Sequence, residues 1–208
     1  MRDKVLVGLS ISLSAVMFGY SLKEITSVPI ATIVKEYDIT TVSSSLASSI
    51  LIGVLPLAAI FGAIITRLLI RSYRRLGGIY FFTLLNIGAI VLVNVTTFAT
   101  LIVGRLIEGV CIGYYTAIAP VYLKEVAPKE LRRLLGLFFS FGKIIGVLIS
   151  IVLELSLEAA EVSISWRIIL SMTAVFSSLQ AILIFFFGTD TPMEMIEKGK
   201  LEEARDII

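Results

Sequence analysis

The chain has 208 residues, of which 57% are hydrophobic and 16% charged, and its mean hydropathy is +0.98. Soluble domains carry about 25% charged residues, and so short a chain cannot hide this much apolar surface in a soluble core, so the composition predicts an all-α integral membrane protein. The absence of histidine excludes catalytic triads and histidine-ligated metals, the single Cys111 excludes a disulfide framework, and the net charge of +2 does not indicate nucleic-acid binding.

Six segments approach the length of about 20 apolar residues that a spanning helix needs. The first has a basic start but no small-residue cleavage site, which favours a spanning helix over a signal peptide. Glycine, serine and alanine are frequent in these segments, as is typical of helices that pack closely in lipid. In chain order the predicted spans are Val5–Leu22, Ser43–Thr66, Leu76–Val95, Phe98–Leu123, Leu134–Leu157 and Arg167–Gly188.

Lysine and arginine are unevenly divided between the two ends of these spans. Thirteen lie at the end that carries both termini, and three, Lys23, Lys35 and Arg167, lie at the other end. Because short cytoplasmic loops are enriched in basic residues, both termini are predicted to be cytoplasmic. The plasma membrane is the expected location.

Residues 1–188 are thus predicted to form the transmembrane bundle, and residues 189–208 the start of cytoplasmic linker helices. Asp190 and Thr191 precede Pro192 and Glu194, a pattern typical of a helix start. The sequence ends inside this helical pattern without a capping glycine, so a truncated or partial chain is expected.

Several ionisable residues lie within the predicted spans or at their ends. A charge at the bilayer centre costs about 2.5–3.5 kcal/mol on insertion scales, so it normally faces an interior and has a partner. Arg105 and Glu108 are three residues apart and share a helix face, and Lys143 has a similar depth in the next span. We therefore predict a mid-membrane cluster of Arg105, Glu108 and Lys143, with Glu24 as a further buried charge. A purely structural ion pair is the alternative to a functional site.

The stretch from Gly104 to Arg133 resembles the signature of the sugar porter family within the major facilitator superfamily. The matching residues are Gly104, Arg105, Gly109, Gly113, Pro120, Tyr122, Glu125, Pro128 and Arg132, while Arg133 replaces a final glycine. Weaker matches are FGYS in the first span, FGKIIGVLIS in the fifth, WRIIL at the start of the sixth, and TDTPMEMIEKGKLEEA, which is closest to plant monosaccharide–proton symporters. The resemblance implies one six-helix half of a twelve-helix carrier for a monosaccharide or polyol, with no cofactor and no enzymatic activity.

The resemblance also implies roles for individual residues. Ser21 stands where proton-coupled relatives have an aspartate that pairs with the arginine matched by Arg105, so uniport is expected, and Glu24, one turn on, is a candidate substitute for that acid. Ser140 aligns with a sugar-binding glutamine but has a shorter side chain. The expected cavity or substrate-binding residues are therefore Ser140, Arg105, Glu108, Lys143, Ser21 and Glu24, with Asn86, Tyr114 and Tyr115 as further polar candidates.

A cytoplasmic charge network that latches the two halves together is also implied by the resemblance. The family's acid and glycine in the loop after the second span are replaced by Ile70 and Tyr73. The remaining candidates are Arg74, Arg75, Glu125, Arg132 and Asp190. Alternatively, these arginines only set the topology through the positive-inside bias.

The expected partners are the lipid bilayer, a sugar or polyol, and a second six-helix half. Three alternatives remain for that half: the chain is a fragment of a longer one, it homodimerises, or it is a degenerate product without transport. The rival class is a non-transporting membrane protein, such as a sugar sensor or a truncated paralogue that docks on other carriers. Ser21, Ser140 and the altered loop after the second span favour it.

Overall fold

The computed structural model describes residues 2–24, 26, 33, 44–70, 75–95, 97–126, 132–160 and 165–188, and within these ranges the side chains of residues 2–10, 44, 126, 132, 135, 165 and 187 are not described. The helices are α1 (Arg2–Glu24), α3 (Ser44–Leu69), α4 (Arg75–Val93), α5 (Phe98–Val126), α6 (Arg132–Ala159) and α7 (Ser165–Phe187). Each predicted span corresponds to one of them. By length and composition α3 to α7 are apolar enough to cross a membrane, and α1 has 23 residues. The predicted all-α membrane fold is confirmed for the described residues, whose six long helices correspond to the six predicted spans.

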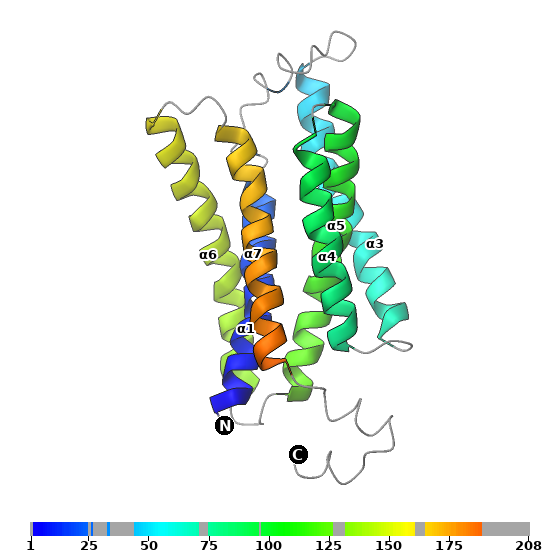
Figure 1. The fold of residues 1–208 in the computed structure, drawn as a ribbon, viewed down its shortest axis with the longest axis vertical. Coiled ribbons are helices and arrows are strands. Elements are labelled where there is room, and N and C mark those ends of the chain that lie inside the picture. Colours follow the sequence, from blue (N-terminus) through cyan, green and yellow to red (C-terminus); the bar gives the residue numbers. More distant parts are fainter. Residues whose placement is uncertain are drawn as a thin grey trace.

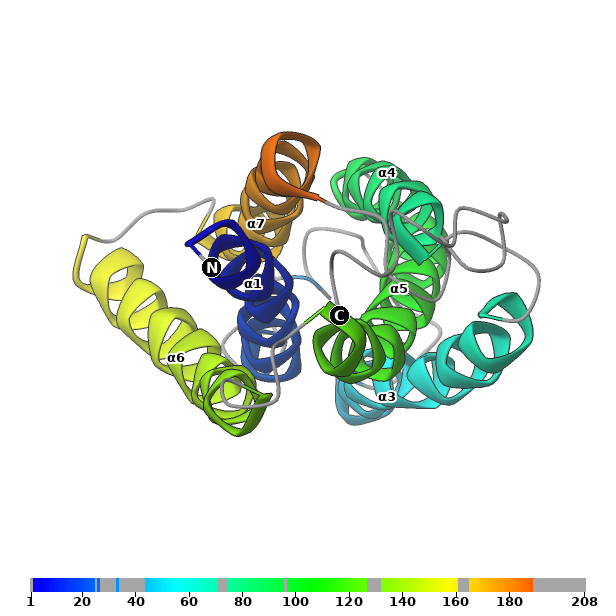
Figure 2. The ribbon, with the colours of Figure 1, turned by 90° about the horizontal axis from the view of Figure 1, so that it is seen from below.

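Consecutive helices run in opposite directions along the long axis of the bundle (Figure 1). Viewed along that axis, α1 and α5 lie in the middle, α4 and α7 lie together on one side, and α6 and α3 lie at the two ends (Figure 2). The main packing partner of α3 is α5, and that of α6 is α1. The second helix of each triplet, α1–α3–α4 or α5–α6–α7, therefore packs on the first helix of the other triplet.

Glycines allow these two outer helices to approach the central ones closely. A Cβ added to Gly113 of α5 would collide with the backbone of Ala59 on α3, and a Cβ added to Gly146 of α6 would collide with the carbonyl group of Val16 on α1. Because apolar burial gives little drive for helix association in lipid, such close backbone contact supplies much of the packing energy. The small residues of these spans therefore have a packing role.

Buried hydrogen bonds join helix α7 to its neighbours α1 and α4. Gln180 donates to Ser14 of α1 at 2.7 Å, and Asn86 of α4 donates to Ser177 at 2.7 Å. The Tyr20 hydroxyl of α1 donates to the Ile169 carbonyl oxygen at 2.7 Å. These bonds satisfy polar groups that would be costly to leave unpaired in an apolar interior.

The outward surface of the bundle is apolar. It includes large, exposed side chains on α3, α6 and α7, among them Leu57, Phe61, Leu68, Leu148, Val152, Phe185 and Phe186. A water-exposed surface of this kind is unusual for a soluble protein, whereas acyl chains would cover it in a bilayer. Residues 189–208, with the predicted linker helix, lie outside the described residues, so that helix stays a prediction.

Candidate functional site

A cluster of three buried ionisable side chains lies where α1, α5 and α7 meet. Arg105 and Glu24 are fully buried and Glu108 is 1% exposed. Nη1 of Arg105 donates to Oε2 of Glu108 at 2.9 Å and also to Oε1 of Glu24. We call Glu24, Arg105 and Glu108 the Arg105 cluster.

Two hydroxyl groups complete the cluster. The Ser21 hydroxyl donates to Oε1 of Glu108 at 3.0 Å, and the Thr173 hydroxyl of α7 donates to Oε2 of Glu24 at 2.9 Å. Each carboxylate therefore accepts one hydrogen bond from the arginine and one from a hydroxyl. This arrangement occupies both oxygens of each acid, as buried carboxylates require.

The spacing of residues along two helices explains how the cluster assembles. Ser21 and Glu24 are three residues apart on α1, and Arg105 and Glu108 are three residues apart on α5, so each pair shares a helix face. The helices are in contact and run side by side, so the two polar pairs meet. Each acid lies opposite a polar group of the other helix.

The cluster has donor capacity left over. If all three groups are ionised, two carboxylates face one guanidinium and the formal charge is −1. Nε and Nη2 of Arg105 meet no acceptor among the residues that the structure describes. Buried donors of this kind usually bind water or another polar molecule, so the cluster can accept a further hydroxyl or water oxygen.

Lys143 does not join this cluster, and its predicted place beside Glu108 is wrong. Its Nζ lies over the rings of Phe18 and Phe139, 5.3 and 5.2 Å from their centroids. The reason is the packing of α6, which lies mainly along α1 and touches α5 little. Glu24 occupies the place beside Arg105 and Glu108 that was predicted for Lys143.

The polar candidates from sequence lie in different surroundings. Ser140 is exposed on α6, and its hydroxyl donates to the Gly136 carbonyl oxygen of its own helix at 3.2 Å. Tyr115 donates to Thr83 at 2.9 Å, and the Tyr114 ring stacks on Phe82 with centroids 3.9 Å apart. The two tyrosines and Asn86 are buried and bind other helices, which is a packing arrangement, while Ser140 remains accessible from outside the bundle.

One pair of the predicted cytoplasmic network lies at the end of the bundle where α1 begins. Nε of Arg75, at the start of α4, lies 2.8 Å from Oε2 of Glu125, near the end of α5. Arg75 is 6% exposed, so the pair is largely shielded from water. Arg74 and Asp190 lie outside the described residues, and Arg132 begins α6 with its side chain not described.

Two contacts of charged residues on α1 were missed by sequence reasoning. Thr173 contacts Glu24 in the Arg105 cluster, and Nζ of Lys23 forms an ion pair with Glu154 of α6 at 3.2 Å. Threonine is common in spanning helices, so nothing in the sequence distinguishes Thr173. The charges of Lys23 and Glu154 were visible, but only the α1–α6 packing shows that they meet.

Comparison with known proteins shows which family the chain resembles. The sequence model of the family described as "Sugar (and other) transporter" matches residues 7–208. Sugar transport protein MST7 of Oryza sativa is 30% identical over 73% of this chain and 29% of its own length, and High glucose sensor RGT2 of Saccharomyces cerevisiae is 31% identical over 96% of this chain and 27% of its own length.

Among solved structures, the xylose transporter XylE from E. coli, in a partially occluded inward-open conformation, is similar with a TM-score of 0.81 at 19% identity, over 98% of this chain and 54% of that one. At this identity the likeness shows the fold, which is that of a major facilitator transporter. The chain spans less than a third of the length of these two curated relatives and about half of the solved one. Because the family model covers nearly the whole sequence, this chain belongs to the sugar (and other) transporter family.

Proposed function

We propose that the chain forms one half of a carrier that moves a monosaccharide or related polyol across a membrane by alternating access. The Arg105 cluster is the observation that carries this proposal. It puts an arginine with spare donors between α1 and α5, the two central helices. In carriers of this superfamily the substrate site lies near the midplane between two six-helix halves. The second half is either a continuation of the same chain or a second copy.

Six residues are proposed to serve substrate binding or its control. Ser140, exposed on α6, is the direct sugar contact, because its hydroxyl can both donate and accept a hydrogen bond. Arg105 and Glu108, with Ser21 and Glu24, form the polar centre behind the cavity wall. Lys143 adds a positive charge on α6, three residues along the chain from Ser140.

The coupling of transport to protons is a separate question. Ser21 favours uniport, because a hydroxyl does not take up and release a proton near neutral pH, whereas a carboxyl group can. The ion pair between Glu24 and Arg105 favours a second candidate, proton-coupled transport with Glu24 as the acid. Purified chain in vesicles with an internal pH dye distinguishes the two.

Under the proton-coupled candidate, adding sugar outside acidifies the vesicle interior. Glu24→Gln then removes the proton signal and leaves sugar exchange at equal concentrations measurable. Under uniport, sugar enters and the internal pH stays constant in both the original chain and the Glu24→Gln variant. Both results require that the variant is folded. Size-exclusion chromatography checks this, and the variant should elute at the same volume as the original chain.

A non-transporting sugar sensor is the alternative function. The similarity to RGT2 favours this alternative. The name of RGT2 describes a glucose sensor, and the similarity extends over 96% of this chain. A sensor binds sugar and keeps its binding site accessible without completing the transport cycle. Ser21 and Ser140, which depart from the transporter pattern implied by the resemblance, are compatible with this role.

The deciding experiment is sugar uptake in a cell that lacks its own sugar carriers. We expect the expressed chain to increase uptake of a labelled hexose, pentose or polyol, and Ser140→Ala to raise the half-saturating concentration several-fold at an unchanged level of the protein in the membrane. Ser156→Ala, which also changes an exposed α6 serine bonded only within its helix, is the matched control. Surface-located chain that binds sugar but gives no uptake would favour the sensor.

The proposed topology has both termini in the cytoplasm of a cell with the chain in its plasma membrane. In this orientation the Arg75–Glu125 pair is cytoplasmic and, with Arg74, Arg132 and Asp190, serves as the latch between the halves. Cysteines placed singly at residues 3 and 162, in a chain with Cys111→Ser, test the orientation. A membrane-impermeant maleimide applied to intact cells should label the cysteine at residue 162 and spare the one at residue 3.

A further inference from the structure

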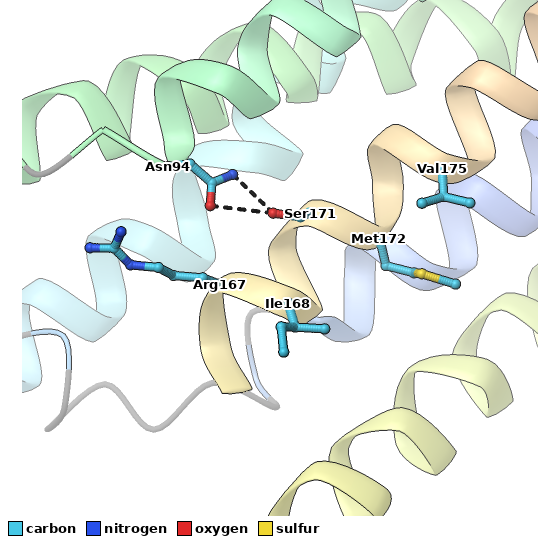
Figure 3. A pocket seen from close by; sticks show the side chains of 6 residues that line it. All are labelled: Asn94, Arg167, Ile168, Ser171, Met172 and Val175. Carbon is cyan, nitrogen blue, oxygen red and sulfur yellow. Dashed lines mark hydrogen bonds between the residues drawn. The ribbon is translucent and has the colours of Figure 1, made fainter. Parts of the chain in front are cut away.

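A groove on α7 lies apart from the Arg105 cluster. It has a volume of about 410 Å³ and is lined by Asn94, Arg167, Ile168, Ser171, Met172 and Val175. Figure 3 shows that Asn94 reaches it from the end of α4 and that the other side chains come from α7. Asn94 and Ser171 are joined by hydrogen bonds of 2.9 and 3.3 Å, which fix the polar end of the groove.

The groove is polar at one end and apolar along the rest. Arg167 is in the first turn of α7, and Asn94 directly follows α4, so both lie where the chain leaves the bilayer. Val175 is eight residues beyond Arg167, about 12 Å deeper along a helix. Ile168 and Val175 are 41% and 55% exposed, on a helix that is long and apolar enough to cross a membrane. The change from polar to apolar along the groove has the direction that a lipid requires, from its headgroup to its acyl chains.

The geometry points to a phospholipid site, in which the phosphate binds Arg167 and one acyl chain lies along Met172 and Val175. A guanidinium binds a phosphate through two parallel, charge-assisted hydrogen bonds. Arg167 also lies over the Trp166 ring, 4.9 Å from its centroid, and this contact orients the guanidinium.

Charge at this end of the bundle favours the same site. The sequence places only three basic residues there, Lys23, Lys35 and Arg167. Of the two whose side chains the structure describes, Lys23 lies on the α1–α6 side of the bundle and Arg167 lines the groove. A lipid whose acyl chain lies in the groove therefore has its phosphate near Arg167 and not near Lys23.

The test uses the full chain purified in a mild detergent and native mass spectrometry to count bound lipids. The probes are dioleoylphosphatidylglycerol, dioleoylglycerol, which has the same acyl chains without the phosphate, and inorganic phosphate. We expect retention of the phospholipid alone, and a loss of affinity of about tenfold in Arg167→Gln, as expected for a charge-assisted hydrogen bond. Lys23→Gln, which removes a charge at the same end, should bind as the original chain does.

A second variant keeps the proposal testable if Arg167→Gln does not fold. Val175→Trp fills the apolar part of the groove from an exposed position and should weaken phospholipid binding without changing the charge. Equal retention of dioleoylglycerol would overturn the role of the phosphate, and binding of inorganic phosphate with the affinity of the phospholipid would show a soluble-anion site. Unchanged phospholipid binding in both groove variants would place the lipid elsewhere.

Discussion

Arg105 and Lys143 are two basic residues inside apolar helices, and they differ in burial and in the groups that stabilise their charge. Arg105 lies where three helices meet, is fully buried, and binds two carboxylates. Lys143 lies where only two helices meet, is half-buried, and has its ammonium over two aromatic rings. At a junction of three helices the charge is shielded from bulk water and from lipid headgroups, so counter-ions are needed. At an interface between two helices, a long side chain can extend until its charged end is near the surface. Two aromatic ring faces are then enough to stabilise the ammonium group, and no carboxylate is needed.

The largest expected effect follows from removing Arg105. Arg105→Leu leaves the Glu24 and Glu108 carboxylates buried side by side without a cation, and breaking a buried ion pair in this way costs about 3–5 kcal/mol. Lys143→Met keeps an apolar stem against Phe18 and Phe139 and should cost less than about 1 kcal/mol. The measurement is the free energy of unfolding, with the monodisperse fraction after solubilisation as a check on folding. Equal losses in the two variants would remove the contrast between the two sites.

The second largest effect is the coupling energy between Arg105 and Glu24, which a double-mutant cycle measures. Combining Arg105→Leu with Glu24→Leu should destabilise the protein by about 1–3 kcal/mol less than the sum of the single changes, because the two side chains share one network. Glu108→Gln combined with Lys143→Met should be additive within about 0.5 kcal/mol, because no ion pair joins these residues in the described structure. Strong coupling in the second cycle would return Lys143 to the cluster that the sequence predicted.

The sequence predicted the six helices well because a long apolar run has one dominant outcome in lipid, a helix that satisfies its own backbone. It also placed Arg105 and Glu108 together, because residues three apart on one helix share a face whatever surrounds them. The partner from another helix could not be found in this way. Lys143 was chosen from equal depth and from the assumption that consecutive helices pack together, and α6 instead packs along α1.

Glu24 is a second case in which a contact between helices could not be predicted from the sequence. Its charge at the end of the first span was visible, but its contact with Arg105 depends on how α1 and α5 cross, which no local pattern records. The Arg75–Glu125 pair was easier to predict, since the resemblance placed both residues in one network and the structure joins them at 2.8 Å. Pairwise contacts within a helix are thus readable from sequence, whereas contacts between helices need the packing order.

Glycine substitutions test the stability of the helix contacts at Gly113 and Gly146, which are made by backbone atoms rather than by charged side chains. Gly113→Ala on α5 and Gly146→Ala on α6 each put a methyl group against the backbone of a neighbouring helix, and overpacking of this kind costs about 1–3 kcal/mol. Gly88→Ala on α4 is the matched control, because nothing lies within 4 Å of its added Cβ, and it should be neutral or slightly stabilising. Thermal unfolding of the purified chain measures all three. A loss at Gly88 as large as at Gly146 would mean that helix flexibility, and not close approach, explains the effect.

The smallest effect is expected where α1 and α6 carry their own ion pair near the end of the bundle. Lys23 and Glu154 lie 3.2 Å apart, but their side chains are 29% and 28% exposed, so solvent screens the attraction in a way that it cannot for Arg105. Exposed pairs contribute about 0.2–1 kcal/mol, and Lys23→Gln and Glu154→Gln should each change the unfolding free energy by no more than this. Raising the salt concentration should reduce the difference from the original chain, while the much larger loss in Arg105→Leu should persist, since its ions are shielded from the solution. A salt-independent loss of several kcal/mol at Lys23 would show that the α1–α6 seam is as closed to water as the three-helix junction.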